Sequence, residues 1–309
     1  MSIIDDIFDA LGGFLADILD STIGNWIGGI FGDLAKLLLD TGVGIYNTLL
    51  GLSIDLLEQS PETWNGGSGW NIVTSVNTAF IALGASLVII FWLIGVISMS
   101  VDERMNVRVE VMLKEFIKLV IAEALVTLSI DIIKSFFSLV SGLTTGFLPT
   151  ASSADLTVPD NINSFFEGTV SFTDGIFCAI VGLFFLIGSV AAGASILYFA
   201  YIRFFKVLLI VPYGAIASST MVGGPAFSHS AANYYKYALS TVFEAATMLL
   251  AIKISSAIIS SSAINIITNE AGTDGITVVQ WMIRGLIMLF ITLGAVKESS
   301  QITQHGLGM

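Results

Sequence analysis

Five polar residues recur along an apolar stretch of the chain, residues 113–138, which reads LKEFIKLVIAEALVTLSIDIIKSFFS. They are Glu123, Thr127, Asp131, Lys134 and Ser138. Because an α-helix turns by about 100° per residue, a helix here would place all five within one sector of about 80°. Such a stripe would extend through most of a hydrocarbon layer of roughly 30 Å. The pattern predicts a polar stripe along one face of a membrane-spanning helix.

The cost of moving charge into a membrane predicts where this stripe faces. Each charged residue near the centre of a span costs roughly 2.5–3.5 kcal/mol to insert, so the stripe should contact protein or water instead of lipid. Asp131 and Lys134 are three residues apart and can pair, whereas Glu123 has no local partner. Three interpretations stay open: a buried polar network between helices, a water-filled conduit or oligomer axis, and a proton relay.

The composition of the chain indicates a membrane protein. The chain has 309 residues, of which 55% are hydrophobic and 12% charged, and its mean hydropathy is +0.88. Soluble domains carry about 25% charged residues, and a water-facing surface cannot be built from half of that supply. We therefore predict an all-α, polytopic membrane protein. Cys178 is the only cysteine, which excludes an intrachain disulfide.

Five segments are long enough to cross a bilayer, since a spanning helix needs about 20 residues. They are residues 79–97, 116–143, 176–202, 237–259 and 276–296. We expect a transmembrane helical domain over residues 76–297, followed by a cytoplasmic tail over residues 298–309. An alternative sixth span covers residues 34–57. Four charged residues argue against it: Asp33, Lys36, Asp40 and Asp55.

The positions of the basic residues predict the orientation. Eight of the twelve Lys and Arg residues fall on one side of these five spans if the chain starts outside. They are Arg104, Arg108, Lys114, Lys118, Arg203, Lys206, Lys236 and Lys297. Because Lys and Arg near span ends stay cytoplasmic, we predict a multi-pass protein of the cytoplasmic membrane with its N-terminus outside and its C-terminus inside.

Residues 1–75 are predicted to form an extracytoplasmic segment that begins with an amphipathic helix. Apolar residues follow a helical period over residues 4–18, and aspartates lie mostly opposite them. Small residues then recur every four positions, a spacing that permits close helix contact, at Gly24, Gly28 and Gly32. We predict that these glycines form a contact between copies in an oligomer, and a flexible segment is the alternative.

A tight turn is predicted just before the span over residues 79–97. Trp64 and Trp70 flank the sequence NGGSG, whose glycines permit a sharp change of direction. Indole rings prefer the membrane–water interface. We therefore expect a turn that is anchored at the membrane surface.

Three further charges lie inside the fourth and fifth predicted spans, namely Glu244, Lys253 and Arg284. Arg284 lies about two turns inside the last span, and Glu244 lies in the fourth span within a sector of small and polar residues. The other members of that sector are Ser240, Thr247, Ala251 and Ser255. We predict that Glu244 and Arg284 form an intramembrane ion pair, with Glu123 as the alternative partner of Arg284.

No pattern in the sequence predicts catalysis. The phosphate-binding motif G-x-x-x-x-G-K-[ST] is not present. His229 and His305 are far apart, and neither has a cysteine or carboxylate at metal-ligand spacing. We therefore expect no enzyme activity, no metal and no cofactor.

Two blocks of the sequence resemble a known family. Residues 60–84 read SPETWNGGSGWNIVTSVNTAFIALG, and residues 203–245 read RFFKVLLIVPYGAIASSTMVGGPAFSHSAANYYKYALSTVFEA. The second block has basic residues at the end of a span, a proline with small residues, a glycine turn, and aromatic residues before the next span. These residues are Arg203, Lys206, Pro212, Gly214, Gly223, Gly224, Tyr234, Tyr235 and Lys236. Both blocks are similar to TrbL-like proteins, also called VirB-six-like, of Gram-positive conjugative elements.

The resemblance implies a polytopic membrane subunit of a type IV secretion machine, which serves conjugative DNA transfer. It implies a homo-oligomeric, pentamer-like ring in the cytoplasmic membrane that contacts other secretion subunits and their ATPases. It also implies transient passage of DNA-linked protein cargo, without a sequence-specific nucleic-acid site. Many relatives carry an acidic residue after the basic one that ends the third span. This chain departs from that pattern, with Phe204, Phe205 and Lys206 there.

Two other classes of function stay open. A self-contained membrane transporter or ion channel is the main alternative. Transporters usually show internal repeats and helices broken at the membrane midplane, and neither is evident in the sequence. An intramembrane enzyme would need a nucleophile and a base, and the sequence offers no such pair.

Overall fold

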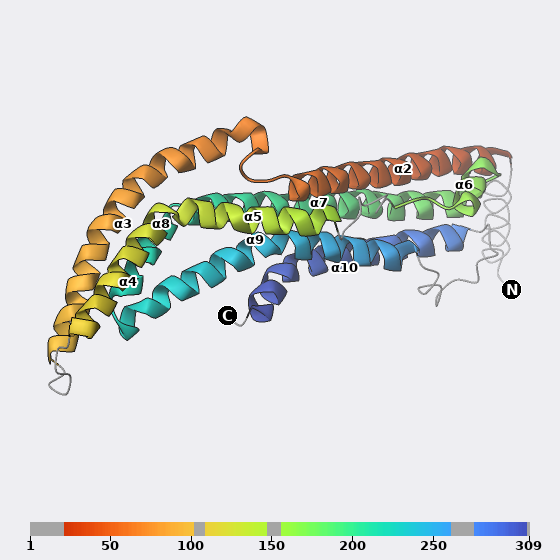
Figure 1. The fold of residues 1–309 in the computed structure, drawn as a ribbon. Coiled ribbons are helices and arrows are strands. Elements are labelled where there is room, and N and C mark those ends of the chain that lie inside the picture. Colours follow the sequence, from red (N-terminus) through yellow and green to blue (C-terminus); the bar gives the residue numbers. More distant parts are fainter. Residues whose placement is uncertain (1–21, 102–108, 147–155, 261–274, 308–309) are drawn as a thin grey trace, which may run out of the picture. The chain divides into compact units, whose positions relative to one another are not determined.

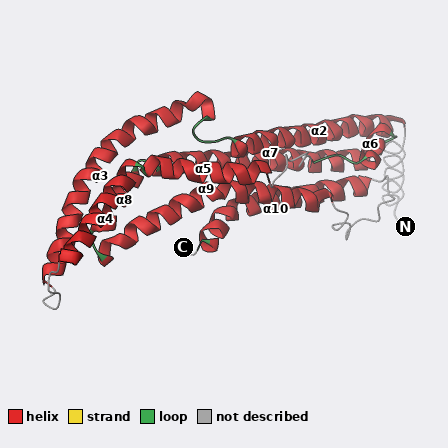
Figure 2. Ribbon diagram, viewed as in Figure 1, coloured by secondary structure: helices red, strands yellow, loops and turns green. Residues whose placement is uncertain are grey.

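The computed structural model describes residues 22–101, 109–146, 156–260 and 275–307 of the chain. Within these ranges the regular structure is helical and contains no strand (Figure 2). Five of the helices are long and apolar enough to cross a membrane. The predicted class, an all-α membrane protein with about five spanning helices, is therefore confirmed. The amphipathic helix predicted over residues 4–18 lies outside the described residues.

The described elements are mostly long helices (Figure 1). In chain order they are α2 (Thr22–Glu58), η1 (Trp64–Gly67), α3 (Ser68–Val101), α4 (Val109–Thr127), α5 (Ser129–Gly146), α6 (Asp160–Glu167), α7 (Phe172–Ile210), α8 (Tyr213–Ser219), η2 (Thr220–Val222), α9 (Pro225–Ser260) and α10 (Gly275–Gly306). The chain divides into two compact units. The first unit comprises Met1–Ser53, Ser152–Leu197 and Ile252–Ala295, and the second comprises Ile54–Ala151, Tyr198–Ala251 and Val296–Met309.

In the first unit, α2 and α7 lie side by side and run in the same direction (Figure 1). Gly42 of α2 lies beside Leu186 of α7. Seven residues further along both helices, Leu49 lies beside Gly193. Residue numbers therefore rise together along the contact, and glycines on both helices let the backbones approach closely.

The helix α10 follows α7 in the same direction within the first unit. Near the start of both helices, the Cys178 Sγ lies 3.7 Å from the carbonyl oxygen of Gly275. Further along, Gly188 lies against the side chain of Leu286. Three parallel helices, α2, α7 and α10, thus form the body of this unit.

Gly28 and Gly32 are used for packing inside the chain. A Cβ atom at Gly28 would lie 2.5 Å from the carbonyl oxygen of Val170, and one at Gly32 would lie 3.1 Å from the Val170 side chain. Gly24 is buried as well. The close approach that small residues permit is therefore made with the segment before α7. The oligomer contact predicted at Gly24, Gly28 and Gly32 stays a prediction.

The five candidate spans are not the same five segments that the sequence predicts, since Trp26–Glu58 takes the place of residues 116–143. The charges that argued against a span here all lie outside residues 41–54. Moreover, Gly42 and Leu49 lie beside Leu186 and Gly193, which belong to the uncharged stretch 176–202. Helix packing thus places the apolar part of α2 beside the most apolar part of α7.

The segment predicted as one span over residues 116–143 forms two helices, α4 and α5, which meet at Leu128. Backbone bonding continues through the junction, because Leu128 N donates to the Ala124 carbonyl at 2.9 Å. The Thr127 hydroxyl donates to the Glu123 carbonyl at 2.9 Å, a bond that often bends helices. The junction therefore keeps the helical register, and the polar stripe stays on one face.

The second unit is built around the short helix α8, which packs against α3, α4 and α5. The core of this contact contains Val88, Ala122, Val126, Ala215 and Val222. Pro212 separates α7 from α8, because it has no N–H to continue the helix. The carbonyl oxygen of Ile210, at the end of α7, accepts a hydrogen bond of 2.8 Å from the Tyr234 hydroxyl. A side chain of α9 thereby stabilises the bend between α7 and α8.

Candidate functional site

An ion pair and a third charged side chain lie where α7 and α9 pack in the second unit. Arg203 is only 3% exposed, and Lys206 lies one turn further along α7. The Lys206 Nζ lies 3.6 Å from Oε1 of Glu244 in α9, and Glu244 is only 4% exposed. The Glu244 carboxylate also attracts the Arg203 guanidinium. Attraction between charges is strong in such a poorly hydrated place, and so is the cost of leaving one uncompensated.

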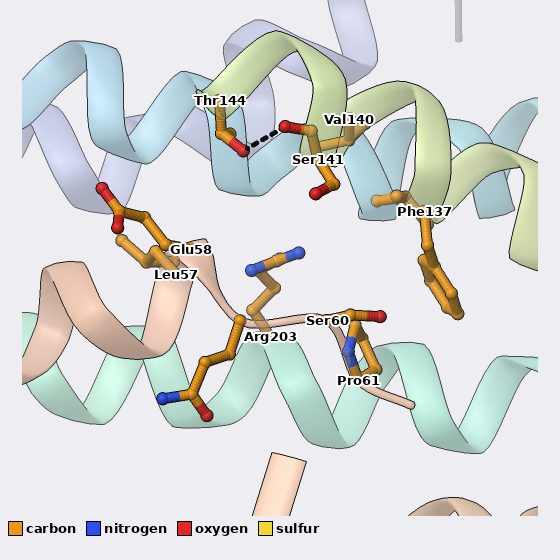
Figure 3. A pocket seen from close by; sticks show the side chains of 11 residues that line it. Leu57, Glu58, Ser60, Pro61, Phe137, Val140, Ser141, Thr144 and Arg203 are labelled. Atoms are coloured by element: carbon orange, nitrogen blue, oxygen red, sulfur yellow. Dashed lines mark hydrogen bonds between the residues drawn. The ribbon is translucent and has the colours of Figure 1, made fainter. Parts of the chain in front are cut away.

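A small pocket lies beside the Arg203 guanidinium (Figure 3). Its walls come from the end of α2, the connection that follows, α5 and α9, and they include Glu58, Ser60, Phe137, Ser141, Thr144 and Val242. The cavity has a volume of about 20 Å³. Such a space holds roughly one or two waters or an object of similar size.

The guanidinium of Arg203 reaches into this pocket, whereas the Glu58 carboxylate points away from it (Figure 3). Within the part of the chain that the structure describes, the buried Nε and Nη1 atoms of Arg203 have no hydrogen-bond partner. Burying a charged hydrogen-bond donor without an acceptor costs more free energy of folding than burying a neutral donor. The pocket therefore offers N–H donors to a small ligand.

The turn before α3 packs against this end of α7. The ring centre of Trp64 lies 5.3 Å from that of Phe204 and 6.1 Å from that of Tyr201. Residues 65–67 all have positive φ angles, of 50°, 66° and 77°. Trp70, on the far side of the turn, is buried. The predicted turn is present, and its tryptophans pack on protein.

The polar stripe lies on an exposed face of α4 and α5. Glu123, Thr127, Asp131 and Ser138 are exposed, and Lys134 is partly exposed. The Lys134 Nζ lies 3.6 Å from Oδ1 of Asp131, which is the predicted i,i+3 pair. These side chains therefore do not form a buried network among the described residues of the second unit, to which α4 and α5 belong.

The ion pair predicted between Glu244 and Arg284 joins residues of different units and stays a prediction. The contact that the structure gives Glu244 is with Lys206. Another residue of the same sector, Thr247, accepts a hydrogen bond of 2.9 Å from the Thr303 hydroxyl. This sector of α9 therefore contacts other helices of the chain.

The basic residues Arg203 and Lys206 indicate orientation in the sequence, and the structure adds their association with Glu244. A usable signal was present in the sequence. Arg203 directly follows the uncharged stretch 176–202, and Lys206 follows one turn later on the same face of a helix. Glu244 is the only acidic residue between positions 175 and 269, so it is the natural partner for both.

Several residues that carry the resemblance to TrbL-like proteins have structural roles in the second unit. The Tyr235 hydroxyl lies 2.6 Å from the Ser218 Oγ of α8, and Tyr234 bonds the end of α7. Gly224 has a φ of 80°, which glycine adopts without strain. No protein-family model matches the sequence, and neither a curated protein nor a solved structure matches it. The resemblance therefore rests on the two blocks alone.

Proposed function

We propose that the chain is a membrane channel or scaffold subunit of a type IV secretion machine for conjugative DNA transfer. The observation that carries this proposal is the exposed polar stripe on α4 and α5, in a chain that otherwise exposes many large apolar side chains. In this proposal several copies form a ring in the cytoplasmic membrane. The stripe of each copy then faces the centre of the ring or a neighbouring copy.

The charges of the stripe explain why a ring suits this chain. Charged residues that face lipid near a span centre cost roughly 2.5–3.5 kcal/mol each. Asp131 and Lys134 compensate each other within one chain, but Glu123 does not belong to that pair. A shared polar space between copies would supply the water or the partner that Glu123 needs. The resemblance adds the other secretion subunits, their ATPases and DNA-linked protein cargo as partners.

The parallel packing of the first unit supports the predicted orientation. Arg203 and Lys206 follow the apolar stretch of α7, so that α7 begins outside and ends inside. The helices α2 and α10 run in the same direction as α7. Both therefore also begin outside and end inside, which agrees with an N-terminus outside and a C-terminus inside. Between α2 and α7 the chain must return to the outer side once, through α3 or through α4 and α5.

Thiol labelling in a Cys178→Ser background tests this orientation. Ser2→Cys is expected to react with an impermeant reagent from outside, and Ser300→Cys from inside only. Met112→Cys distinguishes the two return paths, because it is labelled from inside only if α4 and α5 make the return. Labelling of Met112→Cys from outside would show that α3 makes the return. Labelling of Ser2→Cys from inside would contradict the parallel arrangement of α2 and α7 as spans.

The native mass of the purified chain tests the proposed function. In mild detergent, the chain is expected to form one defined ring of several copies. Cells that lack the chain should lose conjugal transfer and regain it when the chain is supplied. A monomer that is stabilised by a small solute would instead indicate a self-contained transporter, and the ring proposal would be abandoned.

A cysteine at Thr127 tests where the stripe faces. In a Cys178→Ser background, Thr127→Cys is expected to react with a small water-soluble thiol reagent in the assembled ring. Leu139→Cys is the matched control, because Leu139 is exposed but lies about 120° around the same helical register from Thr127. This control should react with a lipid-borne reagent instead. If Thr127→Cys reacts with the lipid-borne reagent, the stripe faces the bilayer and the ring has no polar axis there.

A further inference from the structure

We propose that the Arg203 pocket binds one small monovalent anion of about the size of chloride. This inference does not depend on the secretion function, because it rests on one side chain and the pocket around it. Arg203 comes from α7, and the pocket is completed by the end of α2, the connection after it, α5 and α9. All of these residues belong to the second unit.

The chemistry of the guanidinium favours an anion over a neutral ligand. Arginine stays protonated, so its buried Nε and Nη1 atoms are charged donors. Both lie without a hydrogen-bond acceptor among the described residues. A charge-assisted hydrogen bond to an anion is roughly twice as strong as a bond between neutral groups. An anion in the pocket would therefore remove most of the cost of burying these donors.

Other donors line the same space. The Ser60 hydroxyl accepts a bond of 3.4 Å from Glu62 N, which leaves its own proton to donate. The Thr144 hydroxyl donates to the Ser141 carbonyl at 3.1 Å, so it is not counted as a donor to the ligand. The pocket therefore combines one charged donor group with at least one neutral hydroxyl.

The size of the pocket selects among anions. A cavity of about 20 Å³ has room for one halide ion. A phosphate group carries four oxygens and is larger than a halide ion. Gluconate is larger still. We therefore expect chloride and bromide to bind, and phosphate and gluconate to be excluded.

The charges around the pocket leave Arg203 as the attracting group. Glu244 contacts Lys206 at 3.6 Å and also attracts Arg203, so these three side chains together keep one net positive charge, and only Arg203 of the three lines the pocket. Glu58 is the carboxylate on the pocket wall, and it is partly exposed and points away from the guanidinium (Figure 3). Water screens such a carboxylate. Glu58 therefore weakens anion binding without preventing it.

Equilibrium binding of radioactive chloride to the purified full chain in detergent tests this proposal. One chloride per chain is expected, displaced by bromide but not by phosphate or gluconate. Arg203→Met should lower the affinity by at least about tenfold, because it removes charged hydrogen bonds. Glu58→Gln is the opposite variant and should raise the affinity, because it removes the repelling carboxylate.

A second measurement keeps the test decisive if Arg203→Met does not fold. The wild-type chain should melt at a higher temperature in chloride than in gluconate at equal ionic strength, and Glu58→Gln should enlarge the difference. Equal melting temperatures without chloride binding would show that the pocket holds only water. Chloride binding that Arg203→Met leaves unchanged would place the anion elsewhere. Loss of stability in Glu58→Gln would make Glu58 the partner of Arg203. Each of these three results overturns the proposal.

Discussion

Replacing Glu244 with leucine is expected to lower the free energy of unfolding of the second unit by about 3–5 kcal/mol. The change removes the carboxylate that contacts the Lys206 Nζ at 3.6 Å and attracts the Arg203 guanidinium. Arg203 would keep its positive charge at 3% exposure, and an uncompensated buried charge is strongly destabilising. Unfolding in detergent can be followed by the fluorescence of three tryptophans of this unit, Trp64, Trp70 and Trp92.

Two companion variants show whether charge is the cause. Glu244→Gln keeps the shape of the side chain and loses only the charge, so it should destabilise nearly as much as leucine does. The double change Glu244→Leu with Lys206→Leu should recover part of the lost free energy of unfolding. In this variant Lys206 no longer carries a charge that has lost its partner, and only Arg203 does. If Glu244→Leu unfolds at the same denaturant concentration as the wild type, the association of these charges contributes nothing to stability.

Gly28→Leu is expected to destabilise the first unit by about 3 kcal/mol, at the upper end of what overpacking costs. A Cβ atom at Gly28 would lie 2.5 Å from the Val170 carbonyl oxygen and 2.8 Å from Phe172 N. Both are backbone atoms, so neither can move aside as a flexible side chain could. The helix α2 would have to shift away from the start of α7.

The neighbouring glycine provides the matched control for this change. A Cβ atom at Gly29 has no atom within 4 Å, so Gly29→Leu should leave stability nearly unchanged. Cys178 is fully buried in the first unit and is the only thiol of the chain. The rate at which a thiol-reactive dye labels Cys178 therefore reports opening of this unit directly. Equal labelling rates in the two variants would contradict the close contact at Gly28.

The features that the sequence predicted correctly depend on local geometry or on bulk composition. The shortage of charged residues indicated a membrane-type helical chain without reference to any contact. The shared face of Glu123, Thr127 and Asp131 follows from the helical repeat alone, and the bend at Leu128 does not change it. The pair between Asp131 and Lys134 forms within one turn, so no other helix is needed to bring its partners together.

The features that the sequence could not supply depend on which helices become neighbours. The spacing of Gly28 and Gly32 indicates that a backbone approaches closely, but it does not distinguish Val170 of the same chain from another copy. Arg203 and Glu244 lie far apart in the sequence, and only the packing of α7 on α9 reveals their association. Likewise, a count of charges could not show that α2 lies beside the apolar part of α7.

The turn at residues 65–67 amounts to a short piece of mirror-image helix in an otherwise right-handed protein, because three successive φ angles are positive. An L-residue with a side chain other than Asn or Asp costs roughly 1–2 kcal/mol in such a conformation. The opposite enantiomer fits it naturally. D-alanine at Gly66 should therefore be accepted and even stabilise the turn, by about 0.4–1 kcal/mol through a stiffer unfolded chain. The backbone just before α3 thus has the handedness that D-amino acids prefer, and glycine provides it at two of the three positions.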